Sequence, residues 1–243
     1  MNMGAAVNLE AIWHDLECGA YREDLPLWRA LADEAGGPVL DVGAGTGRVS
    51  LDLAARGVSV VALDTDASLL RALERRAAAL PVETAVADAR EFSLGRRFAL
   101  VLVPMQTLQL LGGPAGRAAF LRRAHEHLEP GGRVAAALAD ALRCFDADHD
   151  VPPPPAVLEI DGVRYASQLR SVVEEDGRAA LHRRRVIVDP AGVESRHAVV
   201  RLDRASAREV AAEARRLGFS VEPERLIPGT EEYLGSTVVV LRA

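Results

Sequence analysis

The chain has 243 residues, of which 49% are hydrophobic and 26% are charged, and its formal net charge is −6. This length accommodates one large domain, or one domain with an insertion, and the acidic balance disfavours a protein that grips nucleic acid over a broad surface. Every basic residue is arginine, which excludes a Schiff-base lysine, a pyridoxal-phosphate anchor and a P-loop lysine.

The two cysteines, Cys18 and Cys144, have neither metal-ligand spacing nor the pattern of a disulfide framework. Reduced thiols of this kind are typical of cytoplasmic proteins. The N-terminal segment lacks the basic and apolar regions of a signal peptide, and no apolar run is long enough to span a membrane. We therefore expect a cytoplasmic protein with no metal site and no membrane contact.

Helical periodicity marks the first 35 residues, and strand and helix patterns alternate after them. We expect strands at residues 39–42, 58–63, 82–87, 98–103 and 133–139, and helices at residues 46–56, 66–80 and 114–128. Unbroken apolar strands separated by helices predict a parallel sheet covered on both faces. Right-handed crossovers then place the carboxyl ends of the strands at one edge of the sheet, where ligands bind.

The pattern changes after Asp140. Period-two alternation with turn signals over residues 157–202 predicts three or four antiparallel strands. A helix at 204–217 and strands at 219–227 and 235–241 follow, and the connection between these strands is short enough to require antiparallel pairing. The expected fold is α/β: a doubly wound, Rossmann-like sheet of seven mostly parallel strands, the last antiparallel, with a small β insertion after the fifth strand.

The predicted domain organisation has three parts. Residues 1–35 form an N-terminal helical lid, and residues 36–140 together with 204–243 form the Rossmann-like domain. Residues 141–203 form the β insertion, which would lie over the ligand edge and cover the substrate.

The densest functional signal is the turn after the first strand, Asp41-Val42-Gly43-Ala44-Gly45-Thr46-Gly47-Arg48. Glycine lacks the Cβ atom that keeps a ligand away from the backbone, and it tolerates positive φ. The dinucleotide fingerprint G-x-G-x-x-G would need glycine where this chain has Arg48, which weakens an NAD interpretation. Asp41 beside the turn would repel a pyrophosphate and suit a cationic ligand; its alternative role is a helix cap or turn stabiliser.

Two further acids end neighbouring strands of the predicted sheet. Asp64, at the tip of the second strand, is placed to accept two hydrogen bonds from a ribose diol. Asp88, at the tip of the third strand, can accept one from the exocyclic amine of adenine. The three acids together predict a site for a nucleoside with a cationic group.

On these features the chain resembles the class I S-adenosylmethionine-dependent methyltransferases. The resemblance is carried, in order, by residues 39–48, 61–64, 87–89, 98–104 and 128–134, the last of which contains Leu-x-Pro-Gly-Gly. It implies that the cofactor is S-adenosylmethionine. It also implies that the residues contacting the cofactor are Tyr21, Asp41, Gly43, Ala44, Gly45, Gly47, Asp64, Thr65, Asp88, Ala89, Val103 and Pro104. Within this set Tyr21 resembles the aromatic residue of a lid helix, with plain core packing as its alternative role.

The sequence carries fewer motifs that indicate the methyl acceptor. The turn Val103-Pro104-Met105-Gln106-Thr107-Leu108 resembles that of small-molecule methyltransferases, and together with the β insertion it implies a small organic acceptor. Such transfer works chiefly by proximity and orientation, and a base is needed only where the acceptor must lose a proton. The candidate catalytic residues are His14, Gln106 and Asp140, each with an ordinary structural role as its alternative.

Several other functions stay open. A tRNA or protein methyltransferase is disfavoured by the acidity of the chain and by the missing Asn/Asp-Pro-Pro-Tyr motif after the fourth strand. A non-catalytic regulatory protein that binds S-adenosylmethionine and an NAD-linked or nucleotide-sugar enzyme are the remaining alternatives. Methylation of oxygen, nitrogen or carbon is equally compatible with the sequence, as is any oligomeric state.

Overall fold

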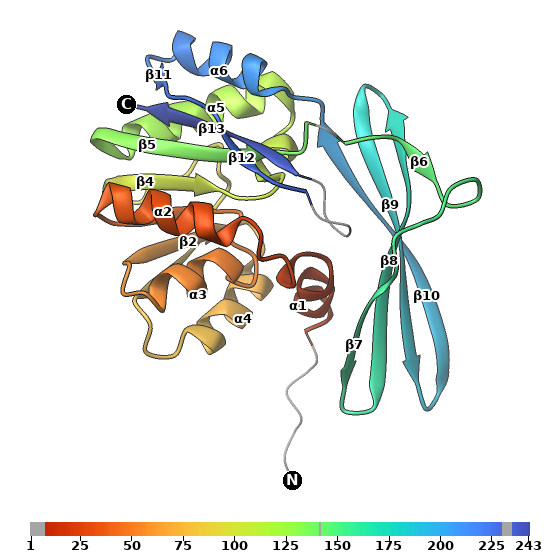
Figure 1. Cartoon of the computed structure of the whole chain (residues 1–243). Helices are drawn as coiled ribbons and strands as arrows, with labels where there is room; N and C mark the ends of the chain where they lie inside the picture. The colour runs from red at the N-terminus through yellow and green to blue at the C-terminus, as the bar shows by residue number, and fades with distance from the viewer. Residues whose placement is uncertain (1–7, 141, 230–234) are drawn as a thin grey trace.

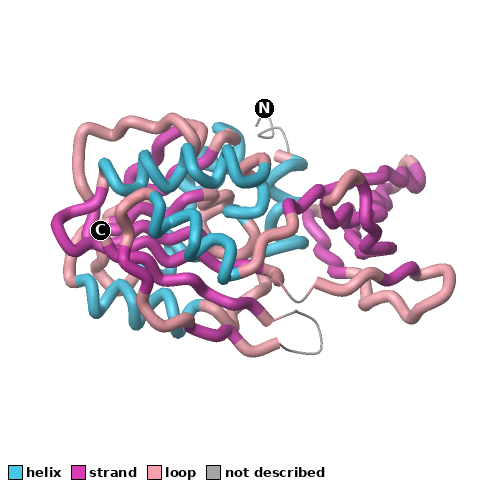
Figure 2. The backbone as a smooth tube through the Cα atoms, turned by 90° about the horizontal axis from the view of Figure 1, so that it is seen from above, coloured by secondary structure: helices cyan, strands magenta, loops and turns pink. Residues whose placement is uncertain are grey.

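The computed structural model describes residues 8–140, 142–229 and 235–243. Figure 1 shows an α/β body built around one sheet, a second sheet standing beside it, and α1 between the two. The view in Figure 2 shows the second sheet projecting from the body as a separate layer of strands.

The central sheet has the strand order β11-β13-β5-β4-β1-β2-β3, with β12 also paired to β13. Strands β1, β2, β3, β4 and β5 run parallel to one another. Strand β13 runs antiparallel to its neighbours β5, β11 and β12. Their bounds are β1 (Val39–Val42), β2 (Val60–Asp64), β3 (Val82–Val86), β4 (Phe98–Val103), β5 (Leu128–Leu138), β11 (Ser220–Val221), β12 (Arg225–Ile227) and β13 (Ser236–Arg242). The predicted mostly parallel sheet with an antiparallel last strand is confirmed.

Two strands differ from the sequence-based expectation. The sixth strand, expected over residues 219–227, is divided into β11 and β12, so the sheet has eight strands rather than seven. Pro223 lies in the gap, and proline has no N–H to donate to a strand ladder. The fifth strand begins at Leu128 because this residue already pairs with Phe98, ahead of an irregularity in the register.

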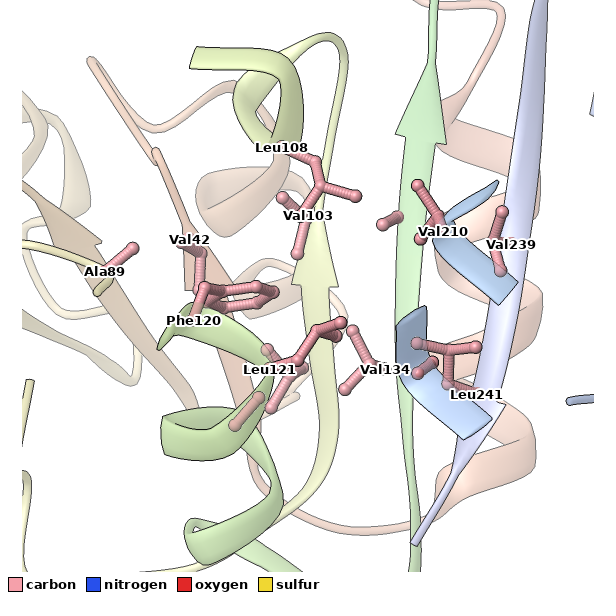
Figure 3. Close-up of a cluster of buried hydrophobic side chains, with 14 of the residues drawn as sticks. Val42, Ala89, Val103, Leu108, Phe120, Leu121, Val134, Val210, Val239 and Leu241 are labelled. Atoms are coloured by element: carbon pink, nitrogen blue, oxygen red, sulfur yellow. The ribbon is translucent and has the colours of Figure 1, made fainter. Parts of the chain in front are cut away.

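Helices cover both faces of this sheet. On one face lie α5 (Gly113–Glu126) and α6 (Ala207–Arg216), whose apolar residues pack on alternate residues of the strands. Figure 3 shows Phe120 of α5 beside Val42, Leu121 of α5 beside Val134, and Val210 of α6 beside Val239. The other face is covered by α2 (Leu25–Ala35), α3 (Arg48–Ala54) and α4 (Ala67–Ala77). Continuous apolar strands are therefore buried on both sides, as a doubly wound fold requires.

The N-terminal region expected as one helical lid has two different environments. Trp28 of α2 is fully buried in the core that covers the central sheet. By contrast, α1 (Leu9–His14) and the π-helical turn η1 (Asp15–Gly19) lie against the second sheet, where Trp13 packs on Tyr165 with ring centroids 5.8 Å apart. Of the described helices in this region, α1 and η1 thus stand at the ligand edge and α2 does not, and residues 1–7 of the expected lid lie outside the described residues.

The second sheet is antiparallel throughout, with the order β10-β9-β8-β6 and β7 also paired to β8. Its strands are β6 (Phe145–Asp146), β7 (Ala156–Ile160), β8 (Val163–Glu175), β9 (Arg178–Asp189) and β10 (Gly192–Asp203). Asp176 and Gly177, between β8 and β9, both have positive φ, as a tight hairpin turn requires. The sheet has five strands, one more than the upper expectation, because of the two-residue β6.

Within the described ranges, no helix has the length and apolar character needed to cross a membrane. The same residues contain no cluster of three or more His, Cys, Asp or Glu side chains that could hold a metal ion.

Candidate functional site

A cavity of about 800 Å³ lies between the carboxyl edge of the central sheet and the inner face of the second sheet. Its walls come from the glycine turn, the ends of β2 and β3, the turn after β4, α1 with η1, and strands β8, β9 and β10. Of the residues selected from the sequence, those on its wall are His14, Tyr21, Asp41, Gly43, Ala44, Asp64, Thr65, Asp88, Ala89, Pro104 and Gln106.

The glycine turn is organised by hydrogen bonds inside the protein. The N–H groups of Gly43 and Ala44 both donate to the carbonyl of Leu63, at 2.8 and 3.0 Å. Gly45 N–H donates to Oδ2 of Asp64 at 2.8 Å. A phosphate-binding turn instead directs its N–H groups at the ligand. At Gly43, Ala44 and Gly45 the turn therefore offers no free N–H donor to a pyrophosphate, which favours a ligand without one.

Asp41 combines burial with an unused acceptor. One of its carboxylate oxygens, Oδ2, accepts a hydrogen bond of 2.6 Å from the hydroxyl of Ser50. The other, Oδ1, is buried and has no hydrogen-bond partner among the described residues. Burial raises the pKa of Asp41 to about 6. A buried carboxylate oxygen on the cavity wall is suited to a cationic donor such as an ammonium group, because an unsatisfied buried acceptor is costly.

The other two acids differ in the acceptor capacity that their internal contacts leave. Asp64 accepts from the N–H groups of Gly45 and Asp66, at 2.8 and 2.9 Å, and a carboxylate can accept about four hydrogen bonds. Asp88 forms an ion pair of 2.5 Å with Arg90, and the hydrogen bonds from Arg90 lower the pKa of Asp88. Asp64 thus has acceptor capacity left for hydroxyl donors, whereas both oxygens of Asp88 accept hydrogen bonds from Arg90 and a ligand amine would share or replace them.

His14 closes the glycine turn from above. Its Nδ1 lies 3.1 Å from the hydroxyl oxygen of Thr46, and that hydroxyl donates its one proton to Asp15 at 2.7 Å. We therefore assign Nδ1 as the protonated nitrogen of His14, which leaves a lone pair on Nε2. Burial lowers the pKa of His14, so the ring is neutral. Nε2 lies against Gly45, where a Cβ atom would stand 2.1 Å from it.

Four residues selected from the sequence do not line the cavity. Gly45 lies beneath His14, and Gly47 has a φ of 93° and packs against Leu73 of α4. Val103 is fully buried in the core, and Asp140 accepts a hydrogen bond of 3.2 Å from Thr237. The glycines at these two positions are therefore needed for the backbone geometry and packing of the turn, and they do not form the cavity surface.

The structure adds charged wall residues that the sequence did not reveal. Arg48 forms a buried ion pair of 2.5 Å with Asp24, and its guanidinium lies 5.3 Å from the centre of the Tyr21 ring. Glu17, Arg183 and Arg185 bring charge to the side of the cavity formed by η1 and β9. Each of these contacts joins distant parts of the chain, so no local sequence pattern predicts it. Arg48 could still have been selected as a site residue, because it directly follows the glycine turn.

Comparison with known proteins agrees with this geometry. Residues 39–132, which include the glycine turn and the three acids, match the family described as "Methyltransferase domain". A 97-residue segment is 36% identical to the cypemycin N-terminal methyltransferase of a Streptomyces species, and it spans 40% of each chain. The chain thus matches well under half the length of that curated relative.

Solved structures resemble the chain over nearly its whole length. A sugar N-methyltransferase from Streptoalloteichus superposes with a TM-score of 0.75 at 21% identity, over 99% of this chain and 96% of that one. An amino pentose methyltransferase from Micromonospora echinaspora, bound to S-adenosylmethionine, has a TM-score of 0.71 at 19% identity over 100% of both chains. Residues 39–132 thus match a methyltransferase domain, and the chain as a whole has the fold of these solved methyltransferases.

Proposed function

We propose that this protein methylates a nitrogen atom of a small organic acceptor. The observation that carries the proposal is the single cavity lined both by the glycine turn with its three acids and by the inner face of the second sheet. When bound, S-adenosylmethionine supplies an activated methyl group on a sulfonium. The second sheet, α1 and η1 would exclude water and hold the acceptor against it.

The cofactor is proposed to bind at the part of the cavity that is lined by the glycine turn. Asp41 Oδ1 is proposed to accept from the ammonium of the methionine part, since it is buried beside the turn without a partner among the described residues. Asp64 is proposed to hold the ribose hydroxyls and Asp88 the adenine amine. Gly43 has to be glycine because a Cβ atom there would stand 2.5 Å from the side chain of Thr107.

His14 is proposed to take the proton from the acceptor amine. A neutral imidazole with a lone pair on Nε2 can accept a proton, and Thr46 holds the ring in that tautomer. Gln106 lies on the same cavity wall and is proposed to orient the acceptor. Asp140 bonds Thr237 outside the cavity wall, which makes it the weakest of the three candidates.

The choice of nitrogen rests on the relatives. One is described as an N-terminal methyltransferase, another as a sugar N-methyltransferase and a third as acting on an amino pentose. A peptide amino terminus is a second candidate acceptor, favoured by the 36% identity to the cypemycin enzyme over 97 residues. A folded polymer is disfavoured, because the second sheet and η1 form walls of the cavity beside the glycine turn.

Two measurements test the proposal. Isothermal titration should give saturable binding of S-adenosylhomocysteine and none of NADH; the opposite result would refute the cofactor assignment. Incubation with methyl-labelled S-adenosylmethionine and a panel of amino sugars and short peptides should then label amines, and blocking those amines by acetylation should abolish the label. Cofactor binding without label on any member of the panel or of a cell extract would point to the regulatory alternative.

A further inference from the structure

The inner face of the second sheet brings two arginines to the cavity, Arg183 and Arg185 of β9. Arg185 is fully engaged: it donates to Glu17 at 2.7 and 2.9 Å, and its guanidinium lies 5.4 Å from the centre of the Trp13 ring. Ser167 donates to the same carboxylate at 2.8 Å. Glu17 is therefore held by Arg185 and Ser167 and has little capacity for a further cation.

Arg183 lacks such an arrangement. Its closest ionic contact within the described ranges is Glu17 Oε2, 4.0 Å from Nε, and its guanidinium forms no hydrogen bond with the described residues. Glu17, Arg183 and Arg185 carry one negative and two positive charges, so this cluster of three residues has one positive charge in excess. The side chain of Arg183 is 22% exposed.

The strand neighbours of Arg183 are apolar. Its cross-strand partners are Leu169 on β8 and Ala198 on β10, and Leu181, two residues before it, also lines the cavity. Nearby Cys18 is an uncharged thiol, because burial raises its pKa to about 11. Apolar walls strengthen the attraction between a cation and an incoming anion, and they make an unpaired charge costly.

The two sides of the cavity thus differ, with Asp41 and Asp64 at the glycine turn and a cluster with one positive charge in excess at the second sheet. We propose that Arg183 is an oxyanion subsite, which binds a carboxylate or phosphate group of the methyl acceptor. The planar guanidinium offers two parallel N–H donors that match either group. This inference rests on the proposed function, because the occupant of the subsite is the acceptor.

The test uses simple anions on the full-length protein, with and without saturating S-adenosylhomocysteine. Inorganic phosphate and acetate are titrated while the guanidinium Nε–H resonance of Arg183, identified by its loss in Arg183→Gln, is followed by NMR. Isothermal titration gives the affinity of each variant. We expect a saturable shift of that resonance, with affinity for the anion at least tenfold weaker in Arg183→Gln. Tighter phosphate binding identifies a phosphorylated acceptor, and tighter acetate binding a carboxylic acid.

Arg184→Gln is the matched control. Arg184 is the next residue on the same strand, is exposed, and donates to Ser195 instead of lining the cavity. This variant should bind the anions as the wild type does, and Arg183→Lys should recover part of the affinity lost in Arg183→Gln. Absence of a saturable shift with both anions, or equal loss of affinity in Arg183→Gln and Arg184→Gln, would overturn the subsite. Failure to bind S-adenosylhomocysteine would overturn the proposed function and not the subsite. The reason is that the Arg183 resonance measures anion binding whether or not S-adenosylhomocysteine is present.

Discussion

Arg185 holds Glu17 through two hydrogen bonds of 2.7 and 2.9 Å, although the two residues lie 168 positions apart in the chain. Glu17 belongs to η1 and Arg185 to β9, so this pair fastens the N-terminal helical segment to the second sheet. Both side chains are mostly buried, with exposed fractions of 10% and 19%. The pair closes one side of the cavity.

Breaking this pair should loosen the N-terminal segment. We expect Glu17→Gln and Arg185→Gln each to lower the free energy of unfolding by about 1–3 kcal/mol, because each leaves a mostly buried charge without its partner. Urea denaturation of both single variants and the double variant gives the coupling energy, which should exceed about 0.5 kcal/mol. Hydrogen exchange over residues 9–19 should speed up in the single variants and stay unchanged in Arg184→Gln. Additive effects would show that the pair does not fasten η1.

Asp41→Asn should separate stability from cofactor binding. Because burial raises the folded-state pKa of Asp41 from 3.8 to about 6, the folded protein binds more protons than the unfolded chain between these values. This residue therefore makes the protein less stable as pH rises from about 4 to 6. The variant should be more stable than the wild type at pH 7.5, by about 1–2 kcal/mol. It should bind S-adenosylhomocysteine about tenfold or more weakly, which corresponds to a loss of about 1.4 kcal/mol or more. Thermal unfolding across pH and isothermal titration measure both effects, and unchanged affinity would contradict the proposed role.

Gly45→Ala should displace His14, whereas Gly36→Ala should not. The two glycines have similar φ values of 56° and 64°, so both substitutions carry the same strain of about 1 kcal/mol. A Cβ atom at Gly45 would stand 2.1 Å from His14 Nε2, but one at Gly36 would have nothing within 4 Å. We expect a larger loss of stability and a changed Trp13 fluorescence only in Gly45→Ala, with His14→Ala reversing the excess loss. An equal loss of stability in the two glycine variants would show that His14 moves aside without lowering the free energy of unfolding.

His14→Gln should slow methyl transfer if His14 accepts the proton of the acceptor amine. Removal of a general base lowers kcat by about 10²-fold or more, with KM for the acceptor changed little. Since burial lowers the pKa of His14 from 6.5, the acidic limb of the wild-type pH profile should have its midpoint below 6.5 and should be lost in the variant. His149→Gln is the control, because His149 is exposed. A rate and profile like those of the wild type would exclude His14 as the base.

Much of the fold could be predicted because local chemistry determines it. Strands such as β4, Phe98–Val103, are unbroken apolar runs, and only a sheet covered on both faces buries such a run completely. The glycine turn and the acids after β1, β2 and β3 were visible for the same reason, because the chain order of a doubly wound sheet places these ends together. Pro223 divided the expected sixth strand, which the apolar pattern alone did not indicate.

The sequence by itself thus determined the parallel sheet, the glycine turn and the sign of charge beside it, since all of these follow from periodicity and from residue type at a strand end. Tertiary structure alone decided that α2 covers the sheet while α1 and η1 stand over the turn. It also decided the tautomer of His14, the pairing of Glu17 with Arg185 and the position of Arg183 at 4.0 Å from the same carboxylate. The physical reason is that hydrogen bonds and ion pairs between distant segments depend on which side chains the fold brings together, and this has no period along the chain.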